Sequence, residues 1–388
     1  MRQVLLGLTI ATAGALAIAG TASATTPGTN KALVYLTSNA ITFDPDGAGP
    51  KDGQTVLTPV GKVTDVEASP DGTRIAYAVV TDASSGDIWV STVHGDRAIH
   101  VTKGAADDRN PAWSPDGTRL VFGRSVDGDQ SEQLWIVNVG GSGAHALTEK
   151  VTGAYDHDPA WSPDGRRIAY SSSATGDNEI WLIDADGKHA HAITDNSVNN
   201  DYPDWSPDGG SLAFTDSPLG QTDIVVMRLS SGLTTNLTPE NGGSAYEPAW
   251  SPDGTHIAYR SAPGATGDIF WRPVGGGAEQ LLSHSSPDLG DSGPSWVPGC
   301  TIKGNTRANT LHGTAKSELI CAGGGNDTVD GGGGLDLILL GTGDDRATGG
   351  AGNDVLVGGP GRDHLDGAAG SDLCVAGPGG ATKTRCER

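Results

Sequence analysis

Short apolar stretches alternate with polar residues through most of the chain, in a unit that recurs about every 45 residues. Each unit contains the string Ser-Pro-Asp-Gly, whose five copies begin at residues 69, 114, 162, 206 and 251. A strand-like stretch such as 74–77 follows the string, then a second such as 87–90, and the unit ends near a Leu-Thr or Val-Thr pair. Alternation with a period of two predicts β-strands, and Pro-Asp-Gly is typical of tight turns. Each unit therefore predicts four short antiparallel strands.

A four-stranded unit of this length is typical of one blade of a β-propeller. A tryptophan precedes the turn in most copies and is predicted to wedge between neighbouring blades, at Trp113, Trp161, Trp205, Trp250 and Trp296. Residues 33–37, 40–44 and 54–58 match the second, third and fourth strands of a further blade, and residues 294–297 match a first strand without partners. The sequence therefore predicts six blades, with the ring closed by pairing residues 294–297 beside residues 32–38.

The motif at residues 159–170, Pro-Ala-Trp-Ser-Pro-Asp-Gly-x-x-Ile-Ala-Tyr, resembles the repeat of TolB-type six-bladed propellers. The resemblance covers about residues 31 to 299. Similar propellers are periplasmic interaction proteins or the gating domains of prolyl oligopeptidase-like peptidases. The resemblance therefore implies a fold and two different classes of function.

From Gly304 the repeat length changes to nine residues, and eight units run to Val375. In the last six units position four is glycine, position eight is mostly apolar, and position six is aspartate, at Asp327, Asp336, Asp345, Asp354, Asp363 and Asp372. This pattern resembles the hemolysin-type (RTX) calcium-binding nonapeptide, Gly-Gly-x-Gly-x-Asp-x-U-x. The fold class implied by both resemblances is all-β, a six-bladed propeller followed by a short parallel β-roll.

The RTX resemblance implies calcium as the cofactor, because carboxylates and turn carbonyls supply the oxygen ligands that this hard cation prefers. In such rolls two nonapeptides make one coil, so each ion lies between equivalent turns of successive coils. That implies about four ions, in the pairs 327–345, 345–363, 336–354 and 354–372, and folding that depends on the metal. The first two units are degenerate, with Asn309 and Glu318 at position six, and we expect shape without strong metal binding there.

The chain contains four cysteines, Cys300, Cys321, Cys374 and Cys386. An even number in an exported protein indicates disulfides, and four cysteines allow three pairings. Pairing Cys300 with Cys321 and Cys374 with Cys386 would staple the two ends of the roll. Crossed pairings would have to span several coils at about 4.8 Å each, beyond the reach of a disulfide.

The N-terminus predicts export. Met1 and Arg2 precede an apolar run at residues 4–19 and the sequence Thr-Ala-Ser-Ala at 21–24, which fits a signal peptide cut after Ala24. The predicted domains are then a signal peptide at 1–24, a propeller at 25–299, and a calcium-binding roll with terminal disulfides at 300–388. We expect a secreted or extracellular protein, or alternatively a periplasmic one, with no membrane span after removal of the signal.

The formal charge is −22, and it becomes −23 when Arg2 is lost with the signal (24 minus 47). Such a charge repels nucleic acid and favours cationic partners or metal ions. Acidic and polar residues gather in the loops that enter each innermost strand, at Asp65, Asp108, Asn110, Asp156, Asp158, Asp201, Glu247 and Asp291. The loops before the third strands add Asp87, Asp129, Asp177 and Asp268. We predict that these loops form a negatively charged face that binds a protein or another cationic ligand.

No catalytic residue is predicted. The sequence contains no Gly-x-Ser-x-Gly elbow, no His-Glu-x-x-His and no Walker loop. The stretch 290–294 around Ser292 looks like a serine-protease nucleophile loop, but it lacks the second glycine and overlaps the anchor of the sixth blade. The leading hypothesis is an exported, non-enzymatic binding protein with a calcium-dependent C-terminal module. The alternatives are a polymer-acting lyase or hydrolase with its active site in the propeller channel, and a structural protein of the cell envelope or matrix.

Overall fold

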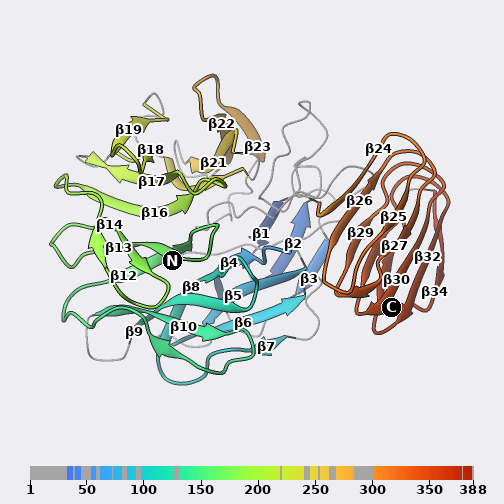
Figure 1. Cartoon of the computed structure of the whole chain (residues 1–388), viewed down its shortest axis with the longest axis horizontal. Coiled ribbons are helices and arrows are strands. Elements are labelled where there is room, and N and C mark those ends of the chain that lie inside the picture. The colour runs from blue at the N-terminus through green and yellow to red at the C-terminus, as the bar shows by residue number, and fades with distance from the viewer. Residues whose placement is uncertain are drawn as a thin grey trace.

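The computed structural model describes residues 33–37, 40–44, 54–57, 62–71, 73–80, 85–92, 98–125, 131–218, 221–239, 245–251, 254–261, 268–283, 300–377 and 379–386. Its regular structure is β, in a propeller followed by a parallel β-roll (Figure 1). Within these ranges no helix has the length and apolar character needed to cross a membrane.

Five antiparallel sheets of four strands form blades 1 to 5. Blade 1 contains β4 (Lys62–Ala68), β5 (Arg74–Val80), β6 (Gly86–Thr92) and β7 (Ile99–His100). Blade 2 contains β8 (Asp107–Trp113), β9 (Arg119–Ser125), β10 (Glu132–Asn138) and β11 (His145–Ala146). Blade 3 contains β12 (Asp156–Trp161), β13 (Arg167–Ser172), β14 (Glu179–Asp184) and β15 (His191–Ala192). Blade 4 contains β16 (Asn199–Trp205), β17 (Ser211–Ser217), β18 (Asp223–Arg228) and β19 (Leu233–Asn236). Blade 5 contains β20 (Ala245–Trp250), β21 (His256–Ser261), β22 (Asp268–Pro273) and β23 (Gln280–Ser283).

A sixth sheet has three strands, β1 (Leu33–Thr37), β2 (Ala40–Asp44) and β3 (Gln54–Leu57), in the order β1-β2-β3. These are the three N-terminal strands that the sequence assigns to the sixth blade. Among the described residues, five blades therefore have all four strands, and the sixth has three. The predicted closing strand, residues 294–297, lies outside the described residues, so its pairing beside Val34 stays a prediction.

Two side chains explain the recurring sequence signals of each blade. The serine of the Ser-Pro-Asp-Gly turn bonds to the aspartate two residues later, as in Ser114 Oγ to Asp116 Oδ1 at 2.6 Å, and accepts the N–H that starts the next strand. The threonine at the end of the unit accepts a backbone N–H from the third strand, as in Ile224 N–H to Thr238 Oγ1 at 2.8 Å. The turn and the outermost strand are thus both fixed within one repeat.

The tryptophans pack between blades as predicted. Trp205 of blade 4 is 4% exposed and lies in one apolar cluster with Ala169 and Leu182 of blade 3. Its indole N–H donates to the carbonyl of Ala160, 3.1 Å away in the same preceding blade. The guanidinium of Arg167 lies 5.0 Å from the ring centroid. Trp113 and Trp205 therefore combine apolar burial, an indole hydrogen bond and a cation–π contact across one blade boundary, and Trp161 combines burial with the cation–π contact to Arg119.

The first strands of neighbouring blades contact each other, so they are the innermost strands of the propeller. Each has a register shift two to three residues before its end, for example between His157 and Ala160. At this bulge a residue other than glycine takes a left-handed conformation, with φ of 51° at Asn110, 49° at Asp158, 56° at Tyr202 and 55° at Glu247. A bulge redirects the side chains around it, which matters for the polar residues of these strands.

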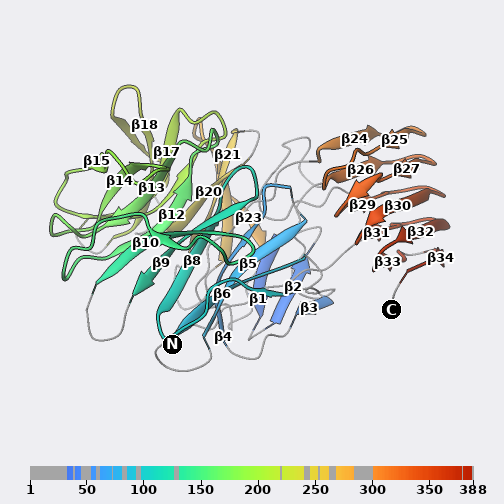
Figure 2. The same ribbon diagram turned by 60° about the horizontal axis from the view of Figure 1, so that its bottom comes forward.

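The roll consists of two parallel sheets. One contains β24 (Ile302–Asn305), β26 (Leu319–Gly323), β29 (Leu337–Leu339), β31 (Val355–Val357) and β33 (Leu373–Val375). The other contains β25 (Thr310–His312), β27 (Thr328–Asp330), β30 (Arg346–Gly352), β32 (Asp363–Ala369) and β34 (Ala381–Thr384), and β28 (Gly333–Gly334) pairs with β30. Figure 2 shows the coils stacked as layers at one side of the propeller.

Successive coils of the roll are offset by 18 residues, as in the pairs Ile320 with Ile338 and Ile338 with Leu356. Two nonapeptides therefore form one coil, and the apolar position-eight residues meet in a thin core. A disulfide joins Cys300 to Cys321, and a second joins Cys374 to Cys386, which is the expected one of the three pairings.

The threonine contact gives a stability prediction. In the Thr238→Val variant the Ile224 N–H loses its acceptor in a fully buried position, so we expect the free energy of unfolding to fall by about 1 to 3 kcal/mol. Urea unfolding at constant calcium measures the change. The control is Thr234→Val on the exposed strand β19, which should change the free energy by less than about 0.5 kcal/mol. Equal losses in the two variants would contradict the role given to Thr238.

Candidate functional site

The position-six aspartates of the roll form two ladders along the stack of coils. In each ladder the Oδ1 atom of one aspartate accepts the backbone N–H of the position-six residue one coil earlier. The distances are 2.7 Å from Asp327 N to Asp345, 3.1 Å from Asp345 N to Asp363, 2.9 Å from Asp336 N to Asp354, and 2.9 Å from Asp354 N to Asp372. All six side chains are buried. The repeat therefore holds each carboxylate at a fixed height in the stack.

In five of these carboxylates the second oxygen has no comparable donor among the described residues. The Oδ2 atoms of Asp327, Asp336, Asp345, Asp354 and Asp363 are buried, and no described residue donates a hydrogen bond to them. Burial raises the pKa of Asp336 to about 8 and the pKa values of Asp345 and Asp354 to about 6. A row of buried carboxylate oxygens without donors is costly unless a cation neutralises it. The donor set fits an ion with a preference for oxygen ligands.

Glycine at position one makes room for these oxygens. A Cβ atom on Gly349 would lie 2.6 Å from Asp354 Oδ2, and one on Gly358 would lie 2.3 Å from Asp363 Oδ2. At these positions a side chain would therefore displace the carboxylate. Glycine at position one serves the carboxylate position in four of the six units, while Ala322 and Leu340 take that position in the other two.

The two degenerate units keep the coil but satisfy their polar groups without an ion. The Asn309 N–H still donates to Asp327 Oδ1 at 2.7 Å, and the Glu318 N–H donates to Asp336 Oδ1 at 2.9 Å. The Glu318 carboxylate accepts hydrogen bonds from the backbone N–H and the hydroxyl of Thr314 in its own turn. Shape is thus retained there, as expected.

A further ladder of hydrogen bonds, which was not predicted from the sequence, connects the residues at position five. Asn326 Oδ1 accepts the Asp344 N–H at 3.1 Å, and Asp344 Oδ1 accepts the Arg362 N–H at 2.9 Å. The Arg362 guanidinium also lies 3.0 Å from the Asp344 carboxylate. A polar residue recurs at position five every 18 residues, at Asn326, Asp344 and Arg362. This spacing is the sequence signal from which the ladder could have been predicted.

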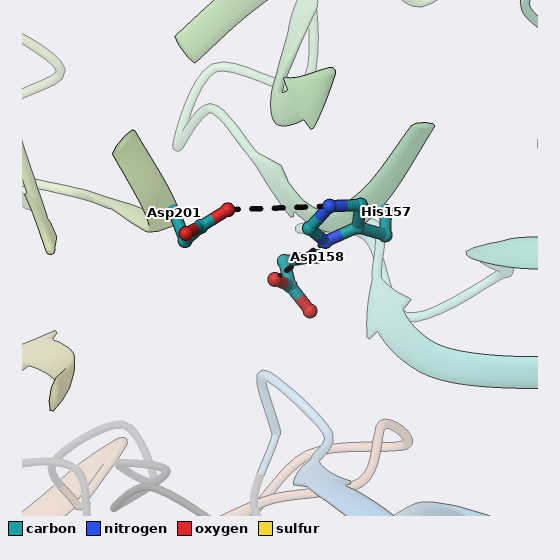
Figure 3. Close-up of side chains that lie close together, drawn as sticks. All are labelled: His157, Asp158 and Asp201. Carbon is teal, nitrogen blue, oxygen red and sulfur yellow. Dashed lines mark hydrogen bonds and ion pairs between the residues drawn. The ribbon is translucent and has the colours of Figure 1, made fainter. Parts of the chain in front are cut away.

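The innermost strands of blades 1 to 4, together with the start of β10 and the loop before β14, bring a second group of polar residues together, which we name the axial cluster. Its members are Asp65, Arg109, Asn110, Glu132, His157, Asp158, Asn178 and Asp201. The Asn110 side chain donates to Asp158 Oδ1 at 2.8 Å, and Asp158 Oδ2 lies 2.8 Å from His157 Nδ1. The Asn178 amide donates to Asp201 Oδ1 at 2.8 Å and lies 3.4 Å from His157 Nε2. Figure 3 shows the His157 ring with one nitrogen facing Asp158 and the other facing Asp201.

His157 is the centre of this cluster. Burial alone would lower its pKa, but the charges of Asp158, Glu132 and Asp201 outweigh burial and raise the pKa to about 9. Burial raises the pKa of Glu132 to about 7 and also raises that of Asp65. Asp65 accepts the Asn110 N–H and lies within the field of Arg109, so the network continues into blade 1.

The acids that the sequence assigns to one face separate into two groups. Asp65, Asp158 and Asp201 join the axial cluster. Asp108 does not, because its carboxylate forms two hydrogen bonds to Arg124 of its own blade, at 2.6 and 2.7 Å. Asp156 likewise accepts the Ser172 hydroxyl at 2.6 Å. Both are buried and tie the first strand to the second, so they do not contribute to an exposed face.

The remaining acids of that prediction lie elsewhere. Glu247 is buried and forms an ion pair with Arg260 at 3.4 Å. Asp87 binds His100 on the outer part of blade 1, at 2.8 Å, and Asp177 is exposed. Asp129 and Asp291 lie outside the described residues, as does the side chain of Asp268.

Two partly buried acids near the ends of innermost strands, Glu67 and Asp204, were not predicted from the sequence to have a role. Glu67 Oε2 accepts the Trp113 N–H of the next blade at 2.7 Å, and Asp204 Oδ2 accepts the Trp250 N–H at 2.6 Å. Burial raises the pKa of Glu67 to about 8 and that of Asp204 to about 7, and the Asp204 charge adds to the shift of Glu67. The available signal was an acid directly before the anchor position, where other repeats have alanine.

Comparison with known proteins identifies two repeat families. The family described as TolB beta propeller domain matches residues 41–200 and 149–303, and the RTX calcium-binding nonapeptide repeat matches residues 303–338 and 339–374. A curated relative, "Uncharacterized peptidase YuxL" of Bacillus subtilis, is 34% identical over 98 residues, which are 24% of this chain and 15% of that protein. The chain therefore spans only a small part of that relative.

Two solved structures show the propeller fold. TolB from Acinetobacter baumannii superposes with a TM-score of 0.56 at 19% identity, over 67% of this chain and 62% of that one. The putative TolB from Agrobacterium tumefaciens gives a TM-score of 0.52 at 21% identity, over 63% of this chain and 94% of that one. At these identities the likeness concerns the fold alone.

The raised pKa of Glu67 predicts a pH dependence of stability. Its pKa rises from an ordinary value of 4.5 to about 8 on folding, so ionisation favours the unfolded chain. The stabilisation is complete below pH 4.5 and is lost as the pH rises through 8, with a slope of at most about 1.4 kcal/mol per pH unit. Glu67→Gln keeps an acceptor for Trp113 and cannot ionise, so wild type should lose stability relative to this variant over that range.

Urea unfolding at saturating calcium, from pH 5 to pH 9, measures this difference. The control is Glu149→Gln, which changes an exposed glutamate and should leave a constant difference from wild type. A constant difference for Glu67→Gln as well would show that Glu67 is already ionised in the folded protein at low pH.

Proposed function

Because the chain belongs to the TolB β-propeller domain family and carries RTX repeats, we propose that it is an exported, non-enzymatic binding protein. Its propeller recognises a cationic segment of another protein through the axial cluster. Its C-terminal roll is a calcium-dependent module. The N-terminal signal sequence and the paired cysteines support export, since disulfides persist in oxidising compartments.

The observation that carries the recognition role is the concentration of acids in the axial cluster. Within this cluster of described residues, four acids (Asp65, Glu132, Asp158 and Asp201) lie with two basic groups, Arg109 and His157, in a chain of net charge −22. Once the acids are ionised, their excess negative charge attracts a positively charged segment and orients its approach.

Calcium dependence rests on the aspartate ladders. The residues that would hold the ion are the six position-six aspartates, in the pairs one coil apart that the Oδ1 hydrogen bonds connect. The bound ion would neutralise the negative charge of the buried Oδ2 atoms. Affinity in the range of extracellular calcium modules, roughly 10⁻⁴ to 10⁻³ M, suffices for folding after export.

An enzyme that acts on a polymer stays the alternative hypothesis. The curated peptidase shares 98 residues with this chain, and these are too small a part of that protein to carry its activity over.

The ladders predict unequal effects of single aspartates on calcium binding. Asp354 is hydrogen-bonded to an aspartate of the coil on each side. Asp327 has an aspartate on one side only, because its partner toward the N-terminus is Asn309 of a degenerate unit. Asp354→Asn should therefore weaken about two of about four ions, and Asp327→Asn only one. Calorimetric titration of the full chain with calcium gives the number of ions bound, and circular dichroism in chelator gives the loss of strand structure.

The control for this titration is Asp330→Asn, an exposed residue of β27 whose replacement should leave the stoichiometry unchanged. Equal stoichiometries for Asp354→Asn and Asp327→Asn would contradict the shared sites. No heat of binding in wild type, together with identical dichroism in calcium and chelator, would end the proposal of a calcium-dependent roll.

The recognition role is tested above pH 8, where the Glu132 carboxyl is ionised, with the double variant Asp65→Asn/Glu132→Gln, which removes two carboxylates of the axial cluster. Proteins captured from the cell surface by the full wild-type chain in calcium should be lost with this variant and in high salt, because screening weakens charge attraction. The control is Asp186→Asn, an aspartate in an exposed turn of blade 3. If the same proteins are captured by the double variant and in high salt as by wild type, recognition by the cluster is ruled out.

A further inference from the structure

Three side chains of the axial cluster are arranged as metal ligands. A ring nitrogen of His157 and one carboxylate oxygen each from Asp158 and Asp201 all lie within 4.8 Å of one another. Two ligands of one ion at bond lengths near 2.2 Å are at most about 4.4 Å apart, so small rotations would let all three bind it. The ligands come from two blades, β12 of blade 3 and β16 of blade 4 (Figure 3).

We propose that His157, Asp158 and Asp201 form a binding site for one divalent transition metal ion of the zinc type, at the axis of the propeller. An imidazole nitrogen with two carboxylates is a ligand set suited to zinc, manganese or iron. It differs from the all-oxygen aspartate ladders of the roll, so the two parts of the chain select different ions.

Neighbouring side chains hold the ligands in place. The Asn110 amide donates to Asp158 Oδ1 at 2.8 Å, and the Asn178 amide donates to Asp201 Oδ1 at 2.8 Å. Such supporting contacts fix the orientation of ligating carboxylates and tune their affinity for a metal. Asp158 is only 8% exposed, His157 21% and Asp201 18%, so the ligands are partly shielded from water and stay accessible to an ion.

Glu132 acts on the site through its charge. It interacts electrostatically with both His157 and Asp158, and its side chain lies over Gly123, where a Cβ atom would come within 1.9 Å of Oε1. The glycine in β9 therefore makes room for this carboxylate. Glu132 is not one of the three groups whose ligand atoms lie within 4.8 Å of one another, so the site has three protein ligands and leaves one position for water or a bound group.

The bulge explains how consecutive residues reach one site. His157 and Asp158 are adjacent in β12, and in a regular strand their side chains would point to opposite faces. The register shift after His157 and the left-handed conformation of Asp158, with φ of 49°, bring both side chains to the same place.

The test is a metal titration of the full-length chain at saturating calcium, with Co²⁺ as the probe, followed by its visible absorption. We expect one Co²⁺ per chain, displaced by Zn²⁺ and retained in excess Ca²⁺ or Mg²⁺. His157→Gln should weaken binding at least about 100-fold, and the supporting variant Asn178→Ala about tenfold. The control is His189→Gln, because His189 also contacts a carboxylate, Asp184 at 2.7 Å, but on the exposed outer part of the blade.

Asp201→Asn provides the same readout where His157→Gln does not fold, and near-ultraviolet circular dichroism of the tryptophans reports folding of each variant. Absence of a saturable Co²⁺ or Zn²⁺ site in wild type would overturn the proposal, as would unchanged affinity in both ligand variants. The titration contains no protein partner. Its outcome is therefore independent of the proposed recognition role, which can fail while the metal site stands, or stand while the metal site fails.

Discussion

Each repeat of this protein buries apolar surface against the repeats beside it along the chain. In the propeller, the contact is made by a tryptophan such as Trp205, which fills the space beside blade 3 and bonds to its backbone. In the roll, Ile320, Ile338 and Leu356 stack directly on one another at an interval of 18 residues. The spacing between repeats is therefore set by apolar packing, and the polar residues take their positions from it.

Polar groups are treated differently in the two parts of the chain. The propeller pairs its buried acids with donors of its own, as in the two hydrogen bonds of Arg124 to Asp108 and the bond of Trp113 to Glu67. In the roll, Asp327, Asp336, Asp345, Asp354 and Asp363 accept a backbone N–H at Oδ1, and no described residue donates to their buried Oδ2. Since an uncompensated buried charge is costly, this arrangement is the physical reason for the calcium dependence proposed for the roll.

The bulge in each innermost strand connects the regular fold to the irregular site. It recurs in blades 1 to 5, so it is a property of the repeat. The residues it redirects differ from blade to blade, with Asn110, Asp158, Tyr202 and Glu247 at the equivalent left-handed position. One backbone feature thus presents a different side chain from each blade, and the axial cluster arises where the presented groups attract one another.

The sequence by itself determined the architecture and most of the aspartate ladders. The turn string, the anchor tryptophans and the nine-residue period each reflect local geometry, so they predict the blades, the 18-residue coil and the position of Asp354 without knowledge of distant contacts. The tertiary structure decided which polar residues meet. Asp108 and Asp156 were grouped with Asp158 because they share loops, yet a strand alternates its sides and the bulge reverses that alternation locally. The contacts of His157 could not be predicted from the sequence. Its partners Asp201 and Asn178 lie in other segments of the chain and come near His157 only in the folded propeller.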